Sequence, residues 1–131
     1  LGQDRERITQ RLLNAVRNHN VDIIGHPTGR LINRRQGLEP AIGELITAAK
    51  QHKTALEINA HWMRLDLRDV HVHAAVQKGC LIAIDCDDHD PSDFDNLRFG
   101  VTTGRRGGLT PDLCVNTWSR DKLTRWLRSK R

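Results

Sequence analysis

The stretch that decides the fold is "CLIAIDCDDHDPSD" at residues 80–93, where an apolar run leads directly into five aspartates and a histidine. A short, β-branched apolar run bounded by polar residues predicts a buried strand, here residues 80–86. Carboxylates gathered at one place repel one another unless something positive lies among them. The sequence therefore predicts a buried strand that ends in a site for a positively charged partner.

Outward from this strand, strands and helices alternate along the chain. Helices are predicted where apolar residues recur at helical spacing, and strands where short apolar runs end in turn residues. The predicted helices are residues 4–19, 40–52, 64–79, 91–101 and 119–130, and the predicted strands are 21–25, 54–60, 80–86 and 113–117. Ser92 and Ser119 are expected to cap the helices that they precede. This order predicts an α/β fold of parallel β/α units, forming an open sheet or half of a barrel.

Length and composition indicate one soluble domain with a basic surface. The chain has 131 residues, and its 21 lysines and arginines against 16 acidic residues give a formal net charge of +5, which favours a polyanionic partner. No apolar run approaches the length of a membrane helix and the first residues are charged, so we expect a cytoplasmic protein. Cys80, Cys86 and Cys114 lack the spacing of a zinc ribbon or disulfide framework and are expected to be buried thiols.

The residues that directly follow the predicted strands are the first candidates for a site, because ligands bind at the carboxyl ends of strands in parallel α/β folds. His26 follows the first strand, and Asp87 and His89 follow the third. In an extended segment Asp87 and His89 would point to one face, and a carboxylate with two imidazoles suits zinc, manganese or iron. Alternatively, the aspartates cap helices and line a solvated turn, and the pattern leaves both possibilities open.

Two other groups of residues were considered as ligands. His71 and His73 form an H-x-H motif, but they lie in a predicted helix, where residues two apart diverge and cannot share one ion. Arginines crowd the loops after the strands, where guanidinium groups suit phosphate oxygens or simply form a solvated basic face; they are Arg30, Arg34, Arg35, Arg64, Arg105 and Arg106. No G-x-S-x-G, P-loop or G-x-G-x-x-G motif indicates a serine hydrolase, nucleoside triphosphatase or dinucleotide enzyme.

Five segments in order resemble one known family. They are "IIGHPTGRLINRR" (23–35), "LEINAHWMRLDL" (56–67), "AIDCDDHD" (83–90), "LRFGVTTGRRGGLT" (97–110) and "VNTWS" (115–119). Together they resemble the C-terminal half of the polymerase and histidinol phosphatase (PHP) domain of bacterial family X DNA polymerases. The resemblance implies a distorted seven-stranded β/α barrel, of which residues 1–131 form roughly half, as a single partial domain. It also implies a cluster of up to three manganese or zinc ions that hydrolyses phosphoesters, with 3′-to-5′ exonuclease and end-processing activity in DNA repair.

The resemblance also implies roles for individual residues. His26, Asp87 and His89 match metal ligands of the catalytic centre, where metal-bound water would be the nucleophile. Arg30 and Arg64 match positions that could hold phosphate. The family's N-terminal H-x-H motif and its later histidine and glutamate ligands have no counterpart in this chain. We therefore expect a fragment that, alone, binds metal weakly and hydrolyses DNA poorly.

The sequence departs from the pattern of the family at two positions. Asp88 replaces the small residue usual between the matching aspartate and histidine, and Gly104 stands where alanine is usual.

Two alternatives to a polymerase-associated phosphoesterase are a free-standing PHP phosphatase acting on small phosphate esters, and a degenerate module that binds DNA or the polymerase core without chemistry. DNA and the polymerase core of the parent protein are the expected partners. An exposed sheet edge would also favour dimerisation of the fragment.

Overall fold

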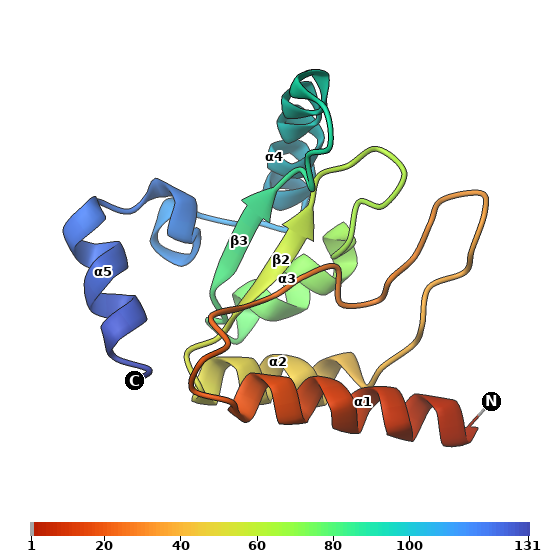
Figure 1. The fold of residues 1–131 in the computed structure, drawn as a ribbon, viewed down its shortest axis with the longest axis horizontal. Coiled ribbons are helices and arrows are strands. Elements are labelled where there is room, and N and C mark those ends of the chain that lie inside the picture. Colours follow the sequence, from red (N-terminus) through yellow and green to blue (C-terminus); the bar gives the residue numbers. More distant parts are fainter. Residues whose placement is uncertain (1) are drawn as a thin grey trace.

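The sheet consists of three parallel strands in sequence order. The computed structural model describes residues 2–131, with side chains from residue 4 onward. Strand β2 (Ala55–Asn59) pairs on one side with β1 (Ile23–Ile24) and on the other with β3 (Ile82–Asp85). The helices that alternate with them are α1 (Gly2–Arg17), α2 (Ile42–Gln51), α3 (Asp69–Gln77), α4 (Leu97–Arg106) and α5 (Arg120–Arg128) (Figure 1). The predicted class of parallel β/α units is confirmed, and within residues 2–131 the sheet is open.

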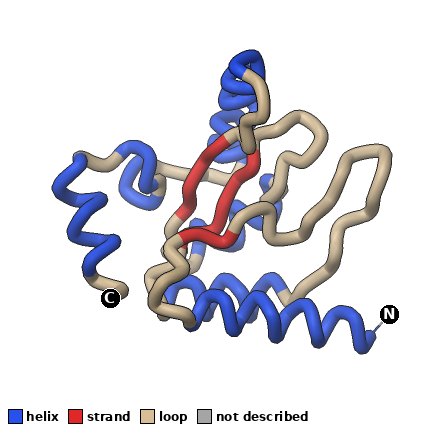
Figure 2. The backbone as a smooth tube through the Cα atoms, viewed as in Figure 1, coloured by secondary structure: helices blue, strands red, loops and turns tan. Residues whose placement is uncertain are grey.

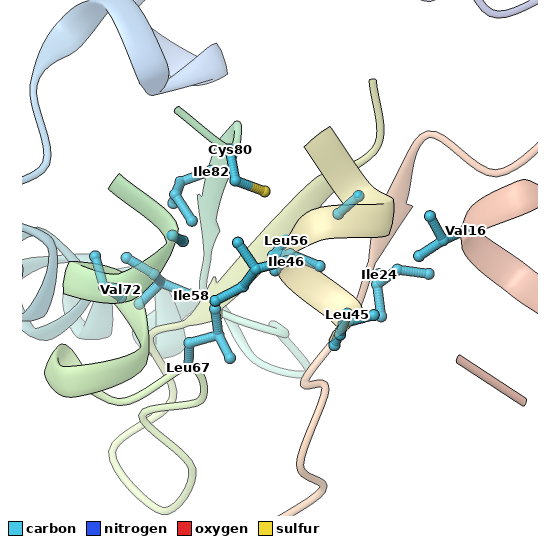
Figure 3. Packing of buried hydrophobic residues seen from close by; sticks show 12 residues of the cluster. Val16, Ile24, Leu45, Ile46, Leu56, Ile58, Leu67, Val72, Cys80 and Ile82 are labelled. Carbon is cyan, nitrogen blue, oxygen red and sulfur yellow. The ribbon is translucent and has the colours of Figure 1, made fainter. Parts of the chain in front are cut away.

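The main core lies between one face of the sheet and helices α2 and α3. Because strand side chains alternate, Leu56 and Ile58 point to this face, and both are fully buried. They pack with Leu45 and Ile46 of α2 and with Val72 of α3 (Figure 3). Helix α1 covers α2 from outside, so the two helices run side by side beneath the sheet (Figure 1).

At the amino ends of the strands, an apolar cluster covers the opposite face of the sheet. Ala55 and Ala83 pack there with Val115 and with Trp126 of α5. The indole Nε1 of Trp126 donates a hydrogen bond to the Lys53 carbonyl at 2.8 Å, which fixes α5 to the loop before β2. The carboxyl ends of the same face carry polar residues instead, and the candidate site lies there.

The prediction of a fourth strand at residues 113–117 is wrong. This segment forms two short 3₁₀ turns, η2 (Pro111–Leu113) and η3 (Val115–Thr117), and Cys114 between them makes an isolated bridge to Ile82. The physical reason lies in Asn116, whose side-chain amide donates to the Ile84 carbonyl and accepts from the Ile84 N–H, both at 2.8 Å. A side chain thus satisfies the edge of β3 where a fourth strand would have used its backbone.

Two predicted helix starts are also wrong. The helix predicted from residue 64 begins at Asp69, because Leu65 has a left-handed φ of 43° that an α-helix cannot contain. The segment after β3 begins with a 3₁₀ helix, η1 (Pro91–Asn96), and its cap is Asp90 rather than Ser92. The side chain of Asp90 accepts from the Ser92 N–H at 2.9 Å. The predicted cap at Ser119 is confirmed, since its hydroxyl accepts from the N–H of residue 122 at 3.2 Å.

Two expectations from composition can be compared with the structure. All three cysteines are buried and free, as predicted, and burial raises the pKa of Cys80 to about 12. In the described part of the chain, the helices are too short or too polar to span a bilayer.

A pair of glycine substitutions tests how closely α4 packs on the sheet. A Cβ on Gly100 would lie 2.6 Å from Ile84 Cγ2 and 2.7 Å from Ala60 Cβ, whereas a Cβ on Gly43 in α2 would meet nothing within 4 Å. We expect Gly100→Ala to lower the free energy of unfolding by about 1–3 kcal/mol through overpacking. Gly43→Ala should raise it by up to about 1 kcal/mol, because the unfolded chain loses freedom. Urea unfolding of both variants measures the difference, and equal effects would contradict the packing described.

Candidate active site at the carboxyl ends of the strands

Three loops follow the carboxyl ends of the strands at one edge of the sheet, and β1 ends level with Leu56, before the end of β2. The loop after β1 spans residues 25–41, the loop after β2 residues 60–68, and the segment after β3 residues 86–90 (Figure 2). Asn59 and Asp85 are partners in the sheet register, so the ends of β2 and β3 are level. The predicted ligands His26, Asp87 and His89 all lie on this edge.

A buried carboxylate joins the first two loops. Asp66 is 0% exposed, and its Oδ2 accepts from the backbone N–H of Thr28 at 3.0 Å and of Gly29 at 2.8 Å. A second link is the hydrogen bond from the Ile32 N–H to the Met63 carbonyl at 2.7 Å. The loop that carries His26 is therefore held in place by the loop after β2.

The backbone of His26 is held in place by Glu57, which is itself paired with Asp85. Its N–H donates to the side chain of Glu57, and its φ of 27° lies in the left-handed region, a conformation that the surrounding contacts must enforce. Glu57 is 6% exposed and is hydrogen-bonded through its side chain to Asp85. Burial, with the Asp85 hydrogen bond second, raises the pKa of Glu57 to about 8. A protonated Glu57 can donate to Asp85 while it accepts from His26, which lets two carboxyl groups share this edge.

Asp87 lies just after β3 and contacts residues of β2 and of the loop after β2. Its Oδ2 accepts from Asn59 Nδ2 at 3.2 Å and forms an ion pair with Arg64 Nε at 3.4 Å. Both described contacts use Oδ2, so Oδ1 is available to a cation. The expectation of an extended segment is wrong at this residue, because Asp87 has a left-handed φ of 52°. Asp87 and His89 are therefore not simply on one face of a continuing strand.

His89 is exposed, as is His26. Its Nδ1 lies 2.7 Å from the Asp87 carbonyl oxygen, and because a carbonyl can only accept, Nδ1 carries the proton. Its backbone N–H donates to the Asp93 carboxylate at 3.0 Å. This tautomer leaves the Nε2 lone pair free, which is the arrangement that a ligating histidine adopts.

The predicted metal centre is only partly assembled by this chain. Two imidazoles and a carboxylate are suitable donors for manganese or zinc. However, no group of three His, Cys, Asp or Glu side chains within residues 2–131 lies close enough to hold one ion. The described residues therefore do not fit a complete metal site by themselves.

The two arginines predicted to bind phosphate lie in different surroundings. Arg64 contacts Asp87, and its NH1 is buried without a partner among the described residues, so it can still donate to an anion. Arg30 instead donates from Nε to the Arg64 carbonyl at 2.6 Å and from NH2 to the Leu65 carbonyl. Arg30 holds the two loops together and borders a separate cleft.

Sequence reasoning missed four polar residues that organise the edge: Glu57, Asn59, Asp66 and Asp85. A signal was present in "ALEIN" (55–59), where Glu57 and Asn59 alternate with leucine and isoleucine in an otherwise apolar strand. Polar residues two apart in a buried strand share a face and need partners. Asp66 had no comparable signal, because its partners are 37 and 38 residues away in the chain.

Comparison with known proteins first places the chain near a class of phosphatases. It is 28% identical over 134 residues to a probable phosphatase of Thermoanaerobacter sp. (strain X514), covering 98% of this chain and 52% of that protein. A probable phosphatase of Caldanaerobacter subterraneus subsp. tengcongensis is also 28% identical, over 98% of this chain and 50% of its own length. A comparison with models of protein families gives no match.

A stronger similarity is to a particular polymerase. The chain is 46% identical over 126 residues to the DNA polymerase/3′-5′ exonuclease PolX of Bacillus subtilis (strain 168). The aligned region is 96% of this chain but only 22% of that protein, so the chain spans about a fifth of this relative and about half of the phosphatases. The resemblance to family X polymerases that the motifs indicated is confirmed by this similarity.

The buried Asp66 carboxylate provides a test of how the site is held. Asp66→Ala removes the acceptor for the Thr28 and Gly29 N–H groups, so we expect the free energy of unfolding to fall by about 2–4 kcal/mol. Amide hydrogen exchange at Thr28 and Gly29 should accelerate as well. Asp95→Ala, at an exposed aspartate, is the control and should change little. Unchanged exchange at residues 28 and 29 would contradict the role given to Asp66.

Proposed function

We propose that this chain is part of a metal-dependent phosphoesterase in a longer protein. The observation that carries the proposal is the placement of His26, Arg64, Asp87 and His89 in the segments that follow the three strands of one parallel sheet. Histidine and carboxylate donors suit a manganese or zinc centre, and a guanidinium beside them suits a phosphate oxygen. Similarity to PolX and to probable phosphatases along almost the whole chain supports the same reaction class.

Within that function, His26, Asp87 and His89 would supply part of the ligand set. His26 is positioned by Glu57, His89 by the Asp87 carbonyl, and Asp87 by Asn59 and Arg64. A bound divalent ion would supply the positive partner that the clustered carboxylates need. Arg64 would orient the phosphoryl group through its unpartnered NH1. We propose that the remaining ligands come from another region of the parent protein, so that this chain alone has little activity.

DNA is the proposed substrate, with hydrolysis from the 3′ end during repair. Identity to PolX, 46%, exceeds the 28% identity to the phosphatases, and the net charge of +5 suits a polyanion. The polymerase core of the parent is the proposed intramolecular partner. The dimerisation expected from the sequence finds no support in these relatives.

A second candidate is a phosphatase that acts on small phosphate esters. The observation in its favour is that the chain spans about half of the phosphatases it matches, a larger share than it spans of PolX. The two candidates differ in substrate but share the reacting residues. Activity on a labelled oligonucleotide, compared with activity on p-nitrophenyl phosphate, therefore separates them.

The direct test uses the parent protein with manganese and a single-stranded oligonucleotide labelled at its 5′ end. Asp87→Ala and His26→Ala should each reduce 3′-end shortening by about 100-fold or more, since even the outer partners of metal ligands are worth about 10- to 100-fold. His73→Ala is the matched control, because His73 is an exposed histidine on α3, away from the edge. It should leave the rate unchanged.

Three outcomes decide this proposal. Shortening that persists in Asp87→Ala would disprove the role of this site. Hydrolysis of p-nitrophenyl phosphate without shortening of the oligonucleotide would favour the phosphatase candidate. Full activity in the isolated 131-residue chain would disprove the need for ligands from elsewhere in the parent.

A further inference from the structure

A cleft of about 470 Å³ lies between the loop after β1 and the amino ends of helices α2 and α3. None of its lining residues is a predicted metal ligand, although Arg30 and Thr28 of the "GHPTGR" motif border it. Thr28 and Arg30 belong to the loop after β1 and Arg68 to the loop after β2, so the cleft shares these two loops with the candidate active site. The cleft is therefore lined by other residues than the predicted metal ligands, although it uses the same loops.

Two buried polar atoms of the lining have no hydrogen-bond partner among the described residues. They are Oγ1 of Thr28, a residue 5% exposed, and Nδ1 of His71. The backbone of Thr28 is fully used, since its N–H donates to Asp66 and its carbonyl accepts from the Leu38 N–H at 2.7 Å. A buried polar atom without a partner costs about 1–3 kcal/mol. Two of them beside one cleft indicate that a polar ligand completes it.

The charge of the lining favours an anion. Arg5, Arg30 and Arg68 border the cleft, against the single carboxylate of Glu39. Arg30 is held in place by the carbonyls of residues 64 and 65, so ordering its side chain costs little when a ligand binds. Burial, and then the charge of Arg68, lower the pKa of His71, so its ring is neutral near pH 7 and offers one N–H.

Two helices have their amino ends beside the cleft, and a helix amino end also favours an anion. Helix α2 begins at Ile42 and helix α3 at Asp69, and neither has a side-chain hydrogen bond at its cap residue, Ala41 or Arg68. Ile42 and Gly43 of α2 line the cleft, as does Arg68. At α3 the N–H groups of Val70 and His71 already donate to Asp69 Oδ1 and to the Arg68 carbonyl. Helix α2 therefore supplies the unpaired N–H groups, and these together with the helix dipole stabilise an anion.

We propose that this cleft binds a phosphate group, held by Arg68, Arg30, the Thr28 hydroxyl and the His71 ring. Guanidinium forks, a hydroxyl and free backbone N–H groups are the donors that phosphate oxygens take. Binding needs no metal, because no predicted metal ligand borders the cleft. The inference is therefore independent of the proposed hydrolysis. The phosphate can belong to the backbone of a polynucleotide or be free.

The first experiment titrates the ¹⁵N-labelled chain with inorganic phosphate in metal-free buffer at constant ionic strength. We expect saturable shifts of the backbone amides of Thr28, Gly43 and His71. Arg68→Gln should weaken binding by about tenfold or more, as expected for loss of a charge-assisted hydrogen bond. Arg125→Gln on α5 makes the same charge change at an exposed arginine outside the cleft and should bind normally. Shifts that never saturate, or equal weakening in both variants, would overturn the proposal.

A second variant separates ligand binding from folding. Thr28→Val keeps the shape of the side chain and removes only the unpartnered hydroxyl. We expect weaker phosphate binding with an unfolding free energy that is unchanged or higher. Normal phosphate binding by this variant would overturn the role of the hydroxyl and with it the assignment of the cleft.

A titration with an oligothymidylate that lacks terminal phosphates shows whether the bound phosphate belongs to a polynucleotide backbone or is free. If the oligothymidylate shifts the same three amides, and Arg68→Gln weakens that effect, the cleft binds backbone phosphates. If inorganic phosphate alone shifts them, the cleft binds free phosphate. Either result supports the site, and failure of both ligands to bind would disprove it.

Discussion

The Asp66 carboxylate is the contact on which both functional regions depend. It is fully buried, and its two oxygens accept from the N–H groups of Thr28 and Gly29. These hydrogen bonds hold the loop after β1 against the loop after β2. On one side of the joined loops His26 reaches the edge of the sheet, and on the other Thr28 and Arg30 border the basic cleft. Without this anchor, neither set of side chains would have a fixed position, because a 17-residue loop is costly to order.

Like charges are managed differently in the two regions. At the strand ends, the carboxyl groups of Glu57, Asp85 and Asp87 lie close together, and the structure offsets this by raising the pKa of Glu57 and by pairing Asp87 with Arg64. Such an acidic cluster is stabilised further by a cation. In the cleft, three arginines border the lining against one carboxylate, Glu39, while the charges of Asp66 and Asp69 also act on Arg30 from nearby. The two regions thus differ in the charge that would stabilise them, a cation at the strand ends and an anion in the cleft.

The left-handed conformations of His26 and Asp87 show how the sheet positions reactive side chains. Non-glycine residues take this conformation at a cost that surrounding contacts must offset. Here those contacts are the Glu57 carboxyl for His26 and the Asn59 and Arg64 side chains for Asp87. All three come from β2 or from the loop after it. The central strand therefore positions the candidate ligands that follow its two neighbours.

Local periodicity determined the alternation of helices and strands, because the apolar spacing of a helix and of a buried strand is visible within a few residues. It also placed His26, Asp87 and His89 at strand ends. Some failures are local, such as the cap at Asp90 in place of Ser92, whereas others arise from contacts between distant residues. Asn116 replaces a fourth strand because its side chain pairs with the backbone of Ile84. Asp66 lies within a predicted helix, but its carboxylate instead accepts a hydrogen bond from the N–H of Gly29, 37 residues earlier in the chain.

The pairing of Glu57 with Asp85, and the cleft that joins Thr28 to His71, likewise exist only once the loops are packed. The H-x-H motif illustrates the limit: helical geometry correctly predicted that His71 and His73 diverge, but only the folded chain shows that His71 turns inward toward a cleft. The sequence by itself determined the elements and the residue types at their ends, since these depend on neighbours along the chain. The tertiary structure decided which of those residues meet, because burial and hydrogen bonding join positions that the sequence keeps far apart.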